Sequence, residues 1–87
     1  MKFRNELVNK EDRYAIGVEV ESGRYFLSIP VRNQMVEYSE FYEIDGGEFL
    51  EFKGNILLAL PLVEKCRKHE NDENLIIPPP HNRGEAF

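Results

Sequence analysis

The chain has 87 residues, of which 41% are hydrophobic and 31% are charged, and this composition is typical of one globular domain rather than two. Sixteen acidic side chains against eleven basic ones give a net charge of −5, which argues against nucleic-acid binding through a broad cationic face. The same balance disfavours attachment to an anionic membrane, so we expect no nucleic acid and no membrane among its partners.

The first thirteen residues are polar and mixed in charge, with Phe3, Leu7 and Val8 as the apolar candidates for docking. This pattern predicts an N-terminal lead-in over residues 1–13. The folded domain is then expected over residues 14–77.

From residue 14 the sequence alternates between apolar and other side chains, a pattern that is typical of β-strands. If Ser22 and Gly23 form a two-residue hairpin turn, Val20 lies opposite Tyr25. The same register predicts three more apolar pairs, which are Val18 with Leu27, Ile16 with Ile29, and Tyr14 with Val31. A slip of one residue would move these side chains to the other face, so the pattern specifies the face strongly.

A third strand is predicted over residues 36–44, where β-branched and aromatic side chains recur. Pairing Val31 with Val36 continues the meander but places Glu40 on the apolar face. Two interpretations stay open. A β-bulge would turn Phe41 inward in place of Glu40, or Glu40 is an inward-facing functional carboxylate.

Two helical segments are expected after the strands. Asp45 followed by Glu48 is a capping-box variant and predicts a short helix that ends near Gly54. Asn55 then caps a turn or 3₁₀ segment over residues 56–60. A regular helix is predicted from Pro61 to about residue 71, because proline is tolerated in a first helical turn.

The C-terminal part is predicted to contain little regular structure. Residues 75–77 could add a short edge strand, and the three prolines at 78–80 would stop it. Residues 78–87 are expected to form an extended tail. These elements together predict an α+β fold, a three-stranded antiparallel meander with C-terminal helices packed on one face.

Two side chains that could support catalysis stand three residues apart, namely Cys66 and His69. Cys66 has the spacing of a small core residue, and His69 belongs to a charged run, so we expect neither to be catalytic. With His81 added, none of the three stands at the spacing of a known zinc or calcium motif. The sequence therefore predicts no enzyme, no metal and no cofactor.

Charge is unevenly distributed along the chain. Residues 33–64 carry seven acidic groups and a single basic one, Lys53. Aromatic side chains are interleaved with these acids, and such a surface would attract a basic protein partner. The alternative is that the acids only keep this face soluble. The predicted partner-binding residues are Glu37, Glu40, Tyr42, Glu43, Asp45, Glu48 and Glu51.

Cysteine usage and the N-terminal sequence indicate a compartment. The single cysteine cannot form an intramolecular disulfide, whereas small extracellular domains usually carry several. The first ten residues lack the apolar stretch of a secretory signal, and the longest apolar run, residues 56–60, is far too short to span a membrane. We therefore expect a cytoplasmic protein.

Three segments carry a resemblance to known proteins, residues 24–31 (RYFLSIPV), 36–44 (VEYSEFYEI) and 62–67 (LVEKCR). They are similar to small bacterial proteins that resemble the immunity members of toxin–immunity pairs, including contact-dependent growth inhibition systems. The resemblance extends over roughly residues 13–84 and contains no catalytic signature. It implies an acidic, cytoplasmic binder that neutralises a basic toxin domain.

The preferred interpretation is a non-catalytic protein-binding module that occludes the active site or substrate groove of a basic toxin domain. Two alternatives from other classes stay open. One is a small enzyme or metal-dependent factor that uses Cys66, His69 or His81. The other is a structural subunit that assembles through an exposed sheet edge.

Overall fold

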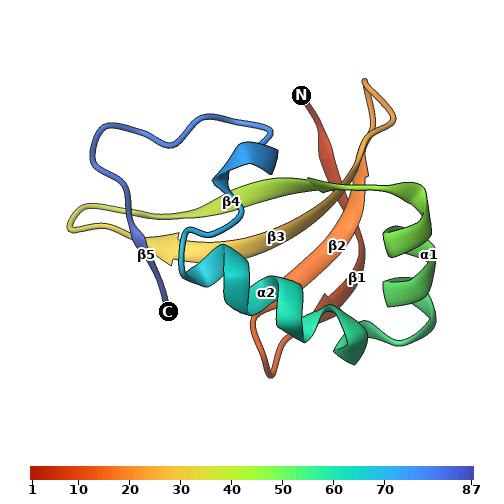
Figure 1. Cartoon of the computed structure of the whole chain (residues 1–87). Helices are drawn as coiled ribbons and strands as arrows, with labels where there is room; N and C mark the ends of the chain where they lie inside the picture. The colour runs from red at the N-terminus through yellow and green to blue at the C-terminus, as the bar shows by residue number, and fades with distance from the viewer.

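An antiparallel sheet with helices on one face forms the molecule, and the computed structural model describes all residues from Met1 to Phe87 (Figure 1). The strands are β1 (Phe3–Asn9), β2 (Tyr14–Glu19), β3 (Tyr25–Arg32), β4 (Glu37–Ile44) and β5 (Glu85–Ala86). The helices are α1 (Gly46–Gly54), the 3₁₀ turn η1 (Ile56–Ala59), α2 (Leu60–Arg67) and the 3₁₀ turn η2 (Asp72–Asn74). The predicted α+β fold is therefore confirmed, and none of the helices has the length and apolar composition needed to cross a membrane.

Strands β1 to β4 follow one another in the sheet as a meander, so the prediction of a lead-in over residues 1–13 is wrong. β1 pairs with β2, and a register shift between Asn5 and Leu7 marks a bulge. Phe3 and Leu7 would share a face on a regular strand, but the extra residue turns them to opposite faces. Leu7 packs against the helix-covered core, whereas the Phe3 ring stacks on Phe41 behind the sheet.

The β2–β3 hairpin has the predicted faces but a register that differs by two residues. Ile16 lies opposite Leu27 rather than opposite Ile29. The connection is longer than the predicted two-residue turn because the carboxylate of Glu19 folds over it. This carboxylate accepts hydrogen bonds from backbone N–H groups at Lys2, Glu21 and Ser22, at 2.8, 3.1 and 2.8 Å. An even shift in register leaves the apolar side chains of the two strands on their predicted face, whereas Val20 falls in the connection and is exposed.

The β3–β4 hairpin is also shifted by two residues, because Val31 lies opposite Tyr38. Here the side chain of Asn33 organises the loop, since its Oδ1 accepts hydrogen bonds from the N–H groups of Met35 and Val36, both at 2.8 Å. No bulge interrupts β4. Glu40 therefore points to the inner, apolar face and is only 4% exposed, so the bulge interpretation is wrong and the carboxylate faces inward.

The helices seal the inner face of the sheet. Asp45 and Glu48 form the predicted capping box at the start of α1, which buries Phe49 and Phe52. Asn55 caps η1, and α2 ends at Arg67, about four residues earlier than predicted. The core that these elements share with the sheet comprises Tyr14, Ile16, Leu27, Ile29, Val31, Tyr42, Ile44, Phe49, Phe52, Ala59, Val63 and Cys66.

On the outer face of the sheet, aromatic side chains from different strands pack against one another. The rings of Phe3, Phe26 and Phe41 form a cluster with centroid separations of 3.7 to 5.3 Å, although they belong to β1, β3 and β4. The sheet is therefore strongly curled. Gly17 permits this curvature, because a Cβ atom there would lie 2.0 Å from the carbonyl oxygen of Arg4.

Residues 78–87, called the strap below, cross the inner face instead of extending freely, while residues 1–77 form the body. Figure 1 shows the strap passing over the β3–β4 hairpin to reach β5. β5 pairs with the end of β3, so the sheet includes residues outside the predicted 14–77 domain. The predicted edge strand at 75–77 is reduced to a bridge between Leu75 and Tyr42 and a hydrogen bond from the Ile76 N–H to the Phe41 carbonyl.

Candidate functional site

The predicted partner-binding residues divide between the two faces of β4. Glu37 and Glu43 are exposed on the outer face, and each contacts an arginine of β3 or its flanking loop, with nitrogen–oxygen distances of 2.6 and 3.8 Å. Glu40 and Tyr42 alternate with them and point into the core. With the strap docked, neither Glu40 nor Tyr42 reaches the molecular surface, which corrects the prediction that they form part of a surface patch.

The remaining acids are Asp45, Glu48 and Glu51, and the first two line a groove together with Glu43. This acidic groove has a volume of about 270 Å³ and is lined by Glu43, Ile44, Asp45, Glu48 and Asn74. In the capping box, Asp45 Oδ1 accepts from the N–H of Glu48 at 2.7 Å, and Glu48 Oε1 accepts from the N–H of Asp45 at 3.1 Å. Each carboxylate keeps a second oxygen free. Glu51 is exposed one turn further along α1.

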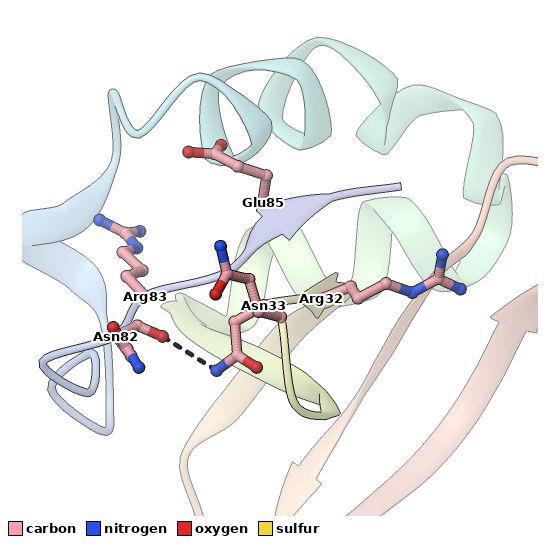
Figure 2. Close-up of a pocket in the computed structure, with 6 residues that line it drawn as sticks. Arg32, Asn33, Asn82, Arg83 and Glu85 are labelled. Carbon is pink, nitrogen blue, oxygen red and sulfur yellow. Dashed lines mark hydrogen bonds between the residues drawn. The ribbon is translucent and has the colours of Figure 1, made fainter.

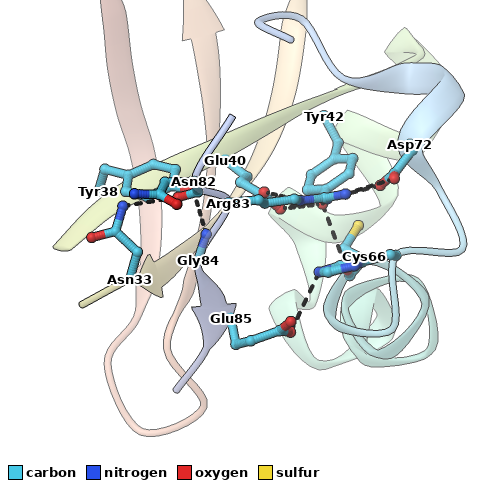
Figure 3. Close-up of polar contacts among 11 residues, drawn as sticks. Asn33, Tyr38, Glu40, Tyr42, Cys66, Asp72, Asn82, Arg83, Gly84 and Glu85 are labelled. Carbon is cyan, nitrogen blue, oxygen red and sulfur yellow. Dashed lines mark hydrogen bonds and ion pairs between the residues drawn. The ribbon is translucent and has the colours of Figure 1, made fainter. Parts of the chain in front are cut away.

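A second arrangement, which we call the Glu40 centre, lies on the inner face of the sheet and comprises Glu40, Tyr42, Asp72 and Arg83 (Figure 3). The Tyr42 hydroxyl donates to Glu40 Oε1 at 2.6 Å. Arg83 of the strap donates from Nε to Glu40 Oε2 at 2.7 Å and from Nη2 to Oε1 at 3.1 Å. Its other edge meets Asp72 at 2.7 and 2.9 Å. The guanidinium is thus held on two sides by carboxylates.

The electrostatics of the Glu40 centre favour the charged pair. The hydrogen bonds that Arg83 donates to Asp72 and Glu40 raise the pKa of Arg83 further above its ordinary value, and Arg83 lowers the pKa of Asp72. Burial, with the hydrogen bond to Glu40, raises the pKa of Tyr42 and keeps its hydroxyl protonated. No buried side-chain nitrogen or oxygen atom lacks a partner. The Glu40 centre is therefore a satisfied polar network that fastens the strap to the body.

Two residues of this centre were not predicted from the sequence, Asp72 and its partner Arg83. The position of Arg83 in the chain explains why it was missed. It follows three prolines in a segment without periodicity, so no pattern connects it to β4. The available signal was indirect. An inward carboxylate on an apolar face requires a cation, and an arginine outside the helices was a candidate.

Cys66, His69 and His81, the residues of the enzyme alternative, do not come together in one site. Cys66 is fully buried, its Sγ accepts from Asn71 Nδ2 at 3.6 Å, and burial raises the pKa of its thiol to about 11. His69 Nε2 lies 3.5 Å from a carboxylate oxygen of Glu85, and His81 is exposed on the strap. No group of three or more His, Cys, Asp or Glu side chains is arranged to hold a metal ion.

A polar pocket of about 420 Å³ lies where the strap meets the β3–β4 loop (Figure 2). It is lined by Arg32, Asn33, Gln34, Asn82, Arg83 and Glu85. The two walls are joined to each other, because Asn33 Nδ2 donates to the carbonyl of Asn82 at 3.0 Å. Both arginines bind carboxylates of the chain itself, Arg32 to Glu37 and Arg83 to Glu40. The pocket therefore lies at the interface between the strap and the body.

No protein-family model matches the chain, and no curated protein or solved structure matches it either. The resemblance to immunity proteins therefore stays a prediction.

Proposed function

We propose that the chain is a non-catalytic binding module for a basic protein partner, and that the acidic groove receives a lysine or arginine side chain of that partner. The observation that carries this proposal is the lining of the groove. It brings Glu43, Asp45 and Glu48 together around about 270 Å³, and the nearest cation, Arg24, contacts Glu43 alone at 3.8 Å.

The capping box supports this role because it fixes two of the three carboxylates before a partner arrives. Asp45 and Glu48 are each held by a backbone N–H group through one oxygen, which leaves the other oxygen free to accept a hydrogen bond from a cation. Carboxylates that are already ordered lose little side-chain entropy on binding. The excess of negative charge would also accelerate the encounter with a basic surface.

The partner class that we propose is a basic toxin domain whose active site or substrate groove the module would occlude. The net charge of −5 and the exposed acids Glu37, Glu43 and Glu51 suit a cationic surface of this kind. In this proposal the chain acts as an immunity protein and works by stoichiometric binding in the cytoplasm.

Two charge reversals test the proposal. Glu43→Lys changes the groove, whereas Glu11→Lys makes the same change in net charge in the β1–β2 turn, away from α1 in Figure 1. Binding of a fluorescent arginine-rich peptide is measured by anisotropy at low and physiological salt. We expect Glu43→Lys to weaken binding and its salt dependence more than Glu11→Lys does.

Equal weakening by the two variants would mean that only net charge matters, and the groove would then have no specific role. The same variants are next used as bait in lysate from the native host. A basic protein that is captured by the unsubstituted chain and by Glu11→Lys, but lost with Glu43→Lys, is the expected partner.

A further inference from the structure

We propose that the strap can leave its own body and bind to the body of a second copy, which gives an exchanged dimer. In this dimer Arg83 of each copy pairs with Glu40 and Asp72 of the other copy. The inference concerns a second interaction, separate from the acidic groove.

The contacts of the strap make such an exchange possible, because its hydrogen bonds and ion pairs all reach the body. Arg83 binds Glu40 and Asp72, and the N–H of Gly84 donates to the Tyr38 hydroxyl at 2.7 Å. β5 pairs only with β3. No hydrogen bond joins two residues of the strap to each other, so each contact can form equally well with an identical body.

The connection between body and strap has the properties of a hinge. Residues 77–82 are exposed, and residues 77–81 make no hydrogen bond to the rest of the chain. Proline has no N–H donor, and three consecutive prolines favour an extended conformation of roughly 3 Å per residue. The hinge can therefore change direction without breaking a hydrogen bond.

The groove under the strap is specific for this sequence, and this favours a second copy over an unrelated peptide. The Glu40 centre holds an arginine on two sides. The next residue must be glycine, since a Cβ atom on Gly84 would lie 2.6 Å from the backbone of Arg32. At the end of the strap, the ring of Phe87 lies 5.3 and 4.3 Å from the guanidinium carbons of Arg13 and Arg32. An identical strap meets all of these requirements.

An opened body favours binding of an arginine, because its Glu40 centre has lost its cation. When the strap leaves, Glu40 and Asp72 lose the cation that they share, and Glu40 keeps only the hydrogen bond from the Tyr42 hydroxyl. Two neighbouring carboxylates without their cation favour binding of an arginine, so an opened body binds the next available Arg83. At high protein concentration that arginine comes from another opened copy as well as from its own strap.

Cysteine cross-linking between two different full-length chains tests the exchange. Arg32 and Glu85 are direct partners in the β3–β5 pairing. One chain carries Arg32→Cys and the other Glu85→Cys, both with Cys66→Ser. The strap of one copy on the body of the other places these two cysteines directly opposite each other and favours a disulfide between the chains. The chains are mixed at high concentration, warmed briefly, cooled and oxidised. The control replaces Arg32→Cys by Ser39→Cys, an exposed site on the outer face of β4.

We expect several-fold more cross-linked dimer from the Arg32→Cys and Glu85→Cys mixture than from the control mixture. Adding Arg83→Leu to the Glu85→Cys chain should reduce the yield to the control level. Equal yields in the first two mixtures, or a yield that does not depend on Arg83, would overturn the proposal.

A second measurement uses the unsubstituted chain and does not depend on how the variants fold. Light and heavy isotope-labelled preparations are mixed at high concentration, warmed and analysed by native mass spectrometry. Mixed dimers that separate only slowly on dilution are expected. Monomers alone at every concentration would reject the exchange.

Discussion

Glu40 and Arg83 lie 43 residues apart in the chain and form a two-point ion pair on the inner face of the sheet, with nitrogen–oxygen distances of 2.7 and 3.1 Å. The Glu40 side chain is 3% exposed and the Arg83 side chain 18%. Burying two charges is itself costly, so the pair adds little net stability compared with apolar side chains. Its main effect is that the stability of the body depends on docking of the strap.

Removing Arg83 should therefore destabilise the protein more than removing both charges. We expect Arg83→Leu to lower the free energy of unfolding by about 3–5 kcal/mol, because Glu40 stays buried without its cation. The double variant Glu40→Leu/Arg83→Leu should recover a large part of this loss. Urea denaturation of both variants measures the difference. A double variant that is less stable than the single one would contradict the assignment.

Glycine at position 84 should be required for the strap to dock. A methyl group on Gly84 would meet the Arg32 backbone at 2.6 Å, whereas at Gly54, the last residue of α1, it would meet nothing within 4 Å. Gly84→Ala should therefore destabilise the protein, and Gly54→Ala should be neutral or stabilising by up to about 1 kcal/mol. Thermal midpoints of the two variants give the comparison, and an unchanged midpoint for Gly84→Ala would mean that the strap is not held closely.

Acid sensitivity should depend on Glu19. Hydrogen bonds from Ser22 and from the N–H of Lys2 lower its pKa from 4.5 to about 2. Because the pKa is lower in the folded state, the stabilisation is fully present above pH 4.5 and is lost as the pH falls towards 2. Glu19→Gln should be less stable than the unsubstituted chain at neutral pH, and the difference should shrink in acid. Thermal midpoints across this range test it, and a constant difference would contradict the pKa assignment.

Cys66 should be unreactive in the folded protein. It is 0% exposed and burial raises its pKa to about 11, so little thiolate forms at neutral pH. A chromogenic disulfide reagent should modify it only after unfolding. Met35→Cys provides the positive control, because residue 35 is 82% exposed. Reaction of Cys66 in the native state as fast as that of the control would favour the enzyme alternative.

The hairpin core can be tested at Leu27, which is fully buried, with the 71% exposed Leu50 as its control. Leu27→Ala should cost about 2–5 kcal/mol through lost burial and a cavity. Leu50→Ala should change stability by no more than about 0.5 kcal/mol. Denaturant midpoints of the two variants decide this, and similar values for both would reject the proposed core face.

The sequence predicts the faces of the strands better than their partners. The alternation over residues 14–31 places Ile16 and Leu27 on the buried face correctly. Both hairpin registers are nevertheless wrong by two residues. Glu19 binds N–H groups of the β2–β3 connection, which is longer than predicted, and Asn33 binds N–H groups of the β3–β4 connection, which lies one residue further along the chain, at residues 33–36. A side chain that folds back on its own loop leaves no signature in hydrophobic periodicity.

Contacts between segments that are far apart in the sequence could not be predicted. β1 was missed because it is a mostly polar edge strand, and its bulge divides its two anchors, Phe3 and Leu7, between opposite faces. The inward direction of Glu40 was one of two interpretations of the alternation in β4. Its cation comes from Arg83, which only the three-dimensional course of the strap brings to it. Short-range capping was predictable, as Asp45 and Glu48 demonstrate.

The position of Arg83 in the chain also has a consequence during protein synthesis. Synthesis delivers β1 to β4, α1 and α2 before Arg83, so a chain that stops before the strap holds Glu40 without its cation. The inner face is then incompletely closed, and a chain interrupted before residue 83 cannot complete it. Such fragments should unfold readily and be removed by cellular proteases. Arg83 thereby couples survival of the protein in the cell to completed translation of the strap.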